Sequence, residues 1–285
     1  MLLCRIVKNQ YGSSLVKWDA MAYARIMPTL IYWIALLGII FSYMTLWYGV
    51  ALYAKRYDVV DVAWGLGFVL LAWVSLALRG SYSHAQLVSA VLVTIWGVRL
   101  AGHIGARILK RPTEDYRYQA MRTKWGTRAD QTAYRAIFIT QGLLIVLVGL
   151  PAVAISFSRS TTNIVTYLGW TVWVAGIVIE AVADWQLRQF IVSRAAKSHK
   201  PCTIGLWHYS RHPNYFGEIV TWWGAGAVAV SLGAWWGIIG AITITILITR
   251  VSGIPPLEKK QVKNKEYDAY RAHTSILIPL PLKKS

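Results

Sequence analysis

The sequence predicts an all-α, polytopic integral membrane protein, a bundle of about seven transmembrane helices. Of its 285 residues, 56% are hydrophobic and only 15% are charged, whereas a soluble domain carries about 25% charged residues. Several apolar stretches also reach the ~20 residues that a helix needs to cross the hydrocarbon core of a bilayer. Seven such spans use about half of the chain, so we expect short loops and no separate soluble domain.

The spans are recognised as apolar runs with few charges, and polar residues mark several of their ends. The second span begins beside Asp58, and Pro213, immediately before the sixth, suits the first turn of a helix. Pro255 and Pro256 end any helix after the seventh span, and the basic tail beyond them is expected to cap the cytoplasmic face. The expected spans are 28–52, 59–78, 86–106, 136–157, 164–185, 214–231 and 234–250, the last two joined as a tight hairpin.

Outside these spans the chain offers little further organisation. We expect residues 28–285 to form a single domain, preceded by a flexible or interfacial leader at 1–27. The leader contains four cations but lacks the pattern of a signal peptide. The two cysteines, Cys4 and Cys202, are too few for a secreted disulfide scaffold.

The net charge of +18 is explained by membrane topology. In a soluble protein such a charge indicates nucleic-acid binding, but cytoplasmic loops of membrane proteins also accumulate Lys and Arg. With the N-terminus outside, the cytoplasmic segments contain 22 cations and the opposite side contains six. We therefore expect a cytoplasmic C-terminus, membrane lipids as neighbours and no nucleic-acid partner.

Ionisable residues inside the spans are the first functional signal. Such residues are costly in a membrane and usually face a bundle interior or a water-filled cavity. Here they recur at helical spacing and at the expected cytoplasmic ends of five helices. They could be ion pairs that hold helices together, but their common depth favours a polar cavity open to the cytoplasm. The sets are Asp58 and Asp61; Arg99, His103 and Arg107; Glu180, Asp184 and Arg188; Glu218; and Arg250.

The residues before the sixth span suggest an anion site. Arg211 and His212 immediately precede the helix that starts at Pro213, and the free N–H groups and dipole of a helix N-terminus attract anions. A phosphate-bearing ligand is one interpretation, and an ordinary helix start with a basic flank is the other. The sequence contains six histidines, and no metal is expected.

These residues form a recognisable motif. It closely resembles the signature of the steroid 5-alpha-reductase-like membrane family, particularly its bacterial branch. The signature alone also occurs in isoprenylcysteine carboxyl methyltransferases and sterol reductases, but supporting motifs extend the resemblance over about residues 50–282. The signature is Arg211-His212-Pro213-Asn214-Tyr215-Phe216-Gly217-Glu218, and the supporting motifs lie at 58–65, 99–103, 114–118, 252–258 and 267–279.

The resemblance implies an enzyme of the bacterial inner membrane that binds NADPH from the cytoplasmic side. It would reduce a carbon–carbon double bond conjugated to a carbonyl in a lipid-like substrate. Asp61 falls where relatives carry the glutamate that engages the substrate carbonyl, and a protonated Asp61 could donate to the developing enolate. The third span has no counterpart of the tyrosine that partners this glutamate, and Glu258 replaces an aromatic residue. The expected cofactor-binding residues are His103, Asp184, Arg188, Arg211, His212, Asn214, Tyr215, Glu218 and Arg250.

Two other function classes are compatible with parts of the sequence. A membrane methyltransferase that uses S-adenosylmethionine fits the signature, although such proteins generally have fewer spans. A non-enzymatic transporter or scaffold is the third class, but the chain shows no inverted repeat with broken helices.

Overall fold

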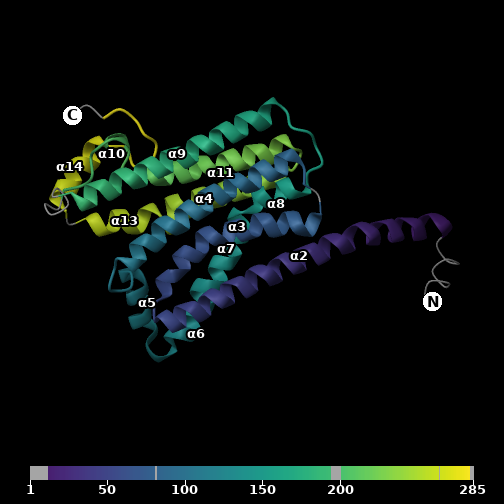
Figure 1. The fold of residues 1–285 in the computed structure, drawn as a ribbon, viewed down its shortest axis with the longest axis horizontal. Helices are drawn as coiled ribbons and strands as arrows, with labels where there is room; N and C mark the ends of the chain where they lie inside the picture. Colours follow the sequence, from purple (N-terminus) through teal and green to yellow (C-terminus); the bar gives the residue numbers. More distant parts are fainter. Residues whose placement is uncertain (1–11, 81, 194–199, 263, 283–285) are drawn as a thin grey trace.

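The expected all-α fold is confirmed by a computed structural model, which describes residues 12–80, 82–193, 200–262 and 264–282 (Figure 1). Six of the described helical stretches are long and apolar enough to cross a membrane. The chain is therefore an integral membrane protein. The six stretches are Thr29–Ala54, Tyr57–Arg79, His84–Leu109, Tyr116–Val148, Ile164–Val192 and Trp235–Gln261.

The first three spans follow the expected order. Helix α2 (Gly12–Ala54) starts before the expected residue 28, and its N-terminal part extends beyond the bundle in Figure 1. Of the predicted leader, residues 1–11 lie outside the described part of the chain. A short turn, η1 (Tyr57–Val59), leads into α3 (Val60–Arg79), and α4 (His84–Leu109) returns antiparallel to it.

The region between the third and fourth expected spans, 107–135, is largely helical, whereas only short loops were expected between the spans. Asp115 caps its first helix by accepting a hydrogen bond from the Arg117 backbone N–H. The prediction of a single helix at 136–157 is also wrong. The observed helix stops at Val148, and a new helix starts after Gly149 with Pro151 in its first turn. The elements are α5 (Tyr116–Trp125), η2 (Gly126–Arg128), α6 (Ala129–Ala133), the π-helix η3 (Tyr134–Ile139), α7 (Thr140–Val148) and α8 (Leu150–Phe157).

Helix α9 (Ile164–Val192) packs closely along α11 (Pro213–Ser231), the expected sixth span. Helix α11 is not among the six strongly apolar stretches, because Asn214, Glu218 and several Gly and Trp residues lower its hydropathy. Seven spans are therefore not established. A Cβ on Gly217 would lie only 2.5 Å from the Glu180 backbone nitrogen, so glycine permits this close helix contact.

The C-terminal third starts with the expected hairpin and ends as a cap. Gly233, with φ of +83°, turns the chain after α11. The tail then packs back onto α10, where the Tyr209 carbonyl accepts a hydrogen bond from the Leu280 N–H. The remaining elements are α10 (Leu206–Tyr209), η5 (Trp235–Gly237), α12 (Ile238–Ile246), the π-helix η6 (Leu247–Val251), α13 (Ile254–Gln261) and α14 (Lys265–His273).

Topology places the expected polar residues together. The C-terminal ends of α2, α4 and α9 lie at the same end of the bundle as the start of α3 and the start of α11 (Figure 1). Helices α5, α13 and α14 cover this end, which we call the capped end.

Candidate functional site

A cavity of about 380 Å³ lies inside the bundle at the capped end, and we call it the inner cavity. It is bordered by α3, α4, α5, α7, α9, α11, α12 and η6. The structure thus brings six predicted site residues together around one space. They are Asp61, His103, Asp184, Asn214, Tyr215 and Glu218.

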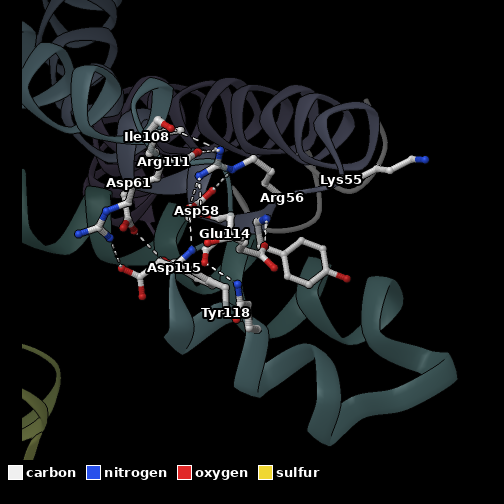
Figure 2. Close-up of polar contacts among 12 residues, drawn as sticks. Lys55, Arg56, Asp58, Asp61, Ile108, Arg111, Glu114, Asp115 and Tyr118 are labelled. Carbon is white, nitrogen blue, oxygen red and sulfur yellow. Dashed lines mark hydrogen bonds and ion pairs between the residues drawn. The ribbon is translucent and has the colours of Figure 1, made fainter.

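Asp61 accepts hydrogen bonds on both carboxylate oxygens. The Tyr118 hydroxyl donates to Oδ1 at 2.6 Å, and the Arg117 guanidinium donates to Oδ2 at 3.1 Å. The Asp61 side chain is 16% exposed, and the Tyr118 side chain is buried on α5 (Figure 2). Asp61 therefore has a tyrosine partner, Tyr118, which lies on α5 after the third span and not within that span.

A second polar network joins α4 to α9. The Arg99 guanidinium donates to Asp184 Oδ2 at 2.9 Å and also pairs with Glu180. Glu180 accepts a further hydrogen bond, at 2.7 Å, from the Trp96 indole N–H. Asn214 on α11 donates its amide to Asp184 Oδ1 at 3.3 Å. The ion-pair interpretation of these residues is therefore correct for Arg99, and the same carboxylates also line the inner cavity.

Glu218 differs from these acids because it makes no hydrogen bond or ion pair with any residue in the described ranges. It lines the inner cavity beside Glu180 and Asp184, one residue after the tight contact of Gly217 with α9. Its carboxylate is therefore available to a ligand.

A larger outer cavity of about 570 Å³ adjoins the inner one and shares Arg107, Arg117, Asn214 and Tyr215 with it. Asp115 is the one carboxylate among the described residues that line it. The cations that line the outer cavity give this cavity a strongly positive field, which suits a phosphate-bearing ligand. They are Arg107, Arg111, Arg117, Lys200, Arg211 and Lys260.

Arg211 and His212 line this outer cavity, but both side chains bind Glu258 of α13. Arg211 Nη2 lies 3.3 Å from Glu258 Oε2, and His212 Nε2 lies 2.9 Å from Oε1. Glu258 also accepts a hydrogen bond from the Tyr267 hydroxyl at 2.5 Å. Burial lowers the pKa of His212 below its ordinary value, although its hydrogen bond with Glu258 acts in the opposite direction. These contacts fix the C-terminal cap to the start of α11.

The two remaining predicted cations lie farther out. Arg188 is exposed and lines a recess of about 300 Å³ that it shares with His103 and Asp184. Arg250 is exposed on η6 and is not part of the lining described for the inner cavity, the outer cavity or the recess. Arg107 lines all three spaces. It was not among the expected cofactor-binding residues, although its helical spacing from Arg99 and His103 placed it among the ionisable residues expected to face a polar cavity.

Comparisons with known proteins agree with the motif. The chain is 30% identical over 115 residues to 3-oxo-5-alpha-steroid 4-dehydrogenase 1 of Rattus norvegicus, a match that spans 40% of the chain and 41% of that relative. No solved structure shows a significant match. The expected resemblance to the steroid 5-alpha-reductase-like family is therefore confirmed. A family model described as "Protein of unknown function (DUF1295)" matches residues 47–274, and the chain belongs to this family.

Proposed function

We propose that this protein is an integral membrane oxidoreductase of the bacterial inner membrane. It uses NADPH to reduce a carbon–carbon double bond conjugated to a carbonyl in a lipid-like or steroid-like substrate. The observation that carries this proposal is the inner cavity, which holds the Asp61–Tyr118 pair and adjoins a strongly basic outer cavity.

The two cavities fit a dinucleotide in composition. The outer cavity offers cations for phosphates, and Arg107, Lys200 and Lys260 make no ion pair with an acid in the described part of the chain. The inner cavity offers neutral and acidic groups for an amide and hydroxyls, among them Asp184, Asn214 and the unpaired Glu218. His103 and Tyr215 border the inner cavity, and Arg188 lines the recess that shares His103 and Asp184 with it. When bound, NADPH supplies the hydride for the reduction.

The chain itself supplies orientation and charge stabilisation. Both oxygens of Asp61 are occupied as acceptors, so the Tyr118 hydroxyl is the donor that can turn toward a substrate oxygen. A hydrogen bond donated there stabilises the negative charge that develops on this oxygen during reduction. Asp61 holds the phenol beside the cavity until the substrate oxygen replaces it as the acceptor of the one hydroxyl proton. Arg117 compensates the charge of Asp61.

Apolar side chains on the other walls of the inner cavity favour a lipid-like substrate. Leu144 on α7 and Ile244 and Ile248 on α12 and η6 line the cavity. On the outward faces of the same helices, Leu143 and Ile246 are 55% and 50% exposed, as expected for contact with lipid. A substrate dissolved in the bilayer is thus separated from the cavity by single helices.

The experiment is a turnover assay on the purified protein in lipid nanodiscs. NADPH oxidation is followed with a 4-en-3-one steroid and with a non-steroidal lipid enone, and the product is analysed by mass spectrometry. We expect enone-dependent NADPH oxidation with saturation of the double bond. Binding of S-adenosylmethionine without NADPH binding would support the methyltransferase alternative, and binding of neither would support a transporter or scaffold.

A further inference from the structure

An ion pair at the turn between α2 and α3 lies outside the cavity but close to Asp61. Arg56 and Asp58 face each other with two parallel hydrogen bonds, Nε to Oδ1 and Nη2 to Oδ2, each of 2.9 Å. The Asp58 side chain is 3% exposed and that of Arg56 is 19% exposed. Burying such a pair is costly unless its remaining hydrogen-bonding capacity is used.

The remaining donors and acceptors of this ion pair form hydrogen bonds with the connection between α4 and α5 (Figure 2). The Arg56 guanidinium donates to the carbonyl oxygens of Arg111 at 3.1 Å, Thr113 at 3.3 Å and Ile108 at 3.4 Å. It thereby binds carbonyls at the end of α4, where a positive charge is favoured. At the other end of the connection, Asp58 Oδ2 accepts the Asp115 backbone N–H at 2.9 Å.

Glu114 adds a second attachment of the same connection. Its carboxylate accepts a hydrogen bond from the Tyr57 backbone N–H, beside Asp58. Arg122 on α5 holds the other Glu114 oxygen at 3.4 Å. The segment from 108 to 115 is thus attached to three residues of the turn before α3, namely Arg56, Tyr57 and Asp58.

The segment 108–115 is followed directly by α5, whose Arg117 and Tyr118 side chains bind Asp61. Asp115 Oδ1 accepts hydrogen bonds from the Arg117 backbone N–H at 3.0 Å and from Arg117 Nε at 3.1 Å. Arg117 then donates to Asp61, and Tyr118 is the next residue. A continuous chain of contacts therefore runs from Asp58 through Asp115 and Arg117 to Asp61.

We propose that Arg56 and Asp58 are positioning residues, which set the Tyr118 hydroxyl and the Arg117 guanidinium against Asp61 by holding the α4–α5 connection. Neither residue lines the inner cavity as described, so both act through α5. The inference deepens the proposed function, because it rests on Asp61 and Tyr118 as the groups that face the substrate oxygen.

The test uses two variants. Asp58→Asn keeps the shape of the side chain, and Arg56→Lys keeps the charge but loses the bidentate contact with Asp58. Each variant is expected to lower kcat with an enone by on the order of 10- to 100-fold, as expected for displacement of a catalytic group. The Kd for NADPH should change less than kcat, because Lys200, Arg211 and Lys260 of the outer cavity do not belong to this connection. Asp268→Asn, which breaks the exposed ion pair with Arg271, is the matched control and should leave kcat unchanged.

A double-mutant cycle separates positioning from general stability. If Asp58 acts through Tyr118, Asp58→Asn should have little further effect on kcat in a Tyr118→Phe background. Independent, multiplying effects of the two changes would overturn the inference. So would a loss of thermal stability in Asp58→Asn with wild-type kcat.

A second readout does not depend on turnover. With 3-fluorotyrosine at position 118, the ¹⁹F resonance reports the contact with Asp61, and Asp58→Asn should move it toward its position in Asp61→Asn. An unchanged resonance in a folded Asp58→Asn protein would overturn the positioning role. If the wild-type protein reduces no enone but this resonance moves, the proposed function fails and the positioning inference stands.

Discussion

Tyr118 and Asp61 are 57 residues apart in the chain, yet their oxygens lie 2.6 Å apart beside the inner cavity. The contact depends on α5 folding back over the start of α3, with Arg117 on the second Asp61 oxygen at 3.1 Å. At the scale of single residues, this pair places a hydroxyl donor, bound to a carboxylate, beside the inner cavity. Its removal should affect turnover more than binding.

Asp61→Asn and Tyr118→Phe should therefore each lower enone turnover by roughly 10²-fold, typical of the loss of a positioned proton donor. NADPH binding should persist in both variants, because the cations of the outer cavity are untouched. The measurement is steady-state kinetics together with a NADPH titration monitored by Trp fluorescence. Wild-type turnover in the Asp61→Asn variant would show that Asp61 acts only at the helix start, where an asparagine substitutes well.

A second prediction at this scale compares Arg188 and Arg250, which were both expected to bind the cofactor. Arg188 borders the recess next to His103 and Asp184, whereas the exposed Arg250 is outside the lining of the cavities as described. Arg188→Ala should weaken NADPH binding by about ten-fold or more, since a hydrogen bond to a charged group contributes about 1.5–3 kcal/mol. Arg250→Ala serves as the control and should bind NADPH as the wild type does. The reverse order of affinities would contradict the placement of the cofactor.

The partner of Asp61 illustrates which residues sequence patterns could and could not assign. Helical spacing was enough to bring Asp61, Asp184 and Glu218 to one end of the bundle, because residues on one helix face have a regular period. Helical spacing did not predict the contact between Asp61 and Tyr118. That contact depends on how α5 is attached to α3, which no periodicity within either helix specifies.

At the scale of helices, the closest packing in the site region is between α9 and α11. Gly217 faces the backbone of Glu180, a residue whose carboxylate lines the inner cavity. The two helices therefore act as one rigid wall that carries Glu180, Asp184, Asn214 and Glu218.

Gly217→Ala should separate this wall, because the added Cβ would meet the Glu180 nitrogen at 2.5 Å. We expect a loss of roughly 1–3 kcal/mol in stability, typical of overpacking, measured by thermal unfolding in detergent. Gly102→Ala is the matched control, since a Cβ there has no neighbour within 4 Å. It should be neutral or stabilising by up to about 1 kcal/mol, because alanine favours the helix. Equal stabilities of the two variants would argue against close α9–α11 packing.

The apolar helices were predictable from sequence because a run of ~20 apolar residues has few alternatives to a membrane span. The polar helix α5 was not, since its stability comes from Asp115 at its start and from contacts with the turn before α3. The break at Gly149 was missed for a related reason, because apolar composition continues across it.

At the scale of the whole molecule, the charge distribution and the site share one end. The segments expected on the cytoplasmic side carry 22 of the 30 cations, and these include the six cations that line the outer cavity. This arrangement would give a soluble dinucleotide direct access from the cytoplasm.

Cysteine labelling tests this orientation. In a background with Cys4 and Cys202 replaced by Ser, Ala120→Cys and Ser160→Cys place single thiols at exposed positions on opposite ends of the bundle. A membrane-impermeant thiol reagent should label position 160 in intact cells and position 120 only after the membrane is opened. Labelling of both positions from one side would contradict the topology.

The central claim is that the adjoining cavities bind NADPH, and calorimetric titration of NADPH into the wild-type protein in nanodiscs tests it most directly. The account predicts saturable binding of one NADPH per chain. Binding should be reduced by competition with 2′-phospho-ADP-ribose, which retains the phosphates for the outer cavity but lacks the nicotinamide. No heat is expected with S-adenosylmethionine. Saturable binding of S-adenosylmethionine with none of NADPH would contradict the account.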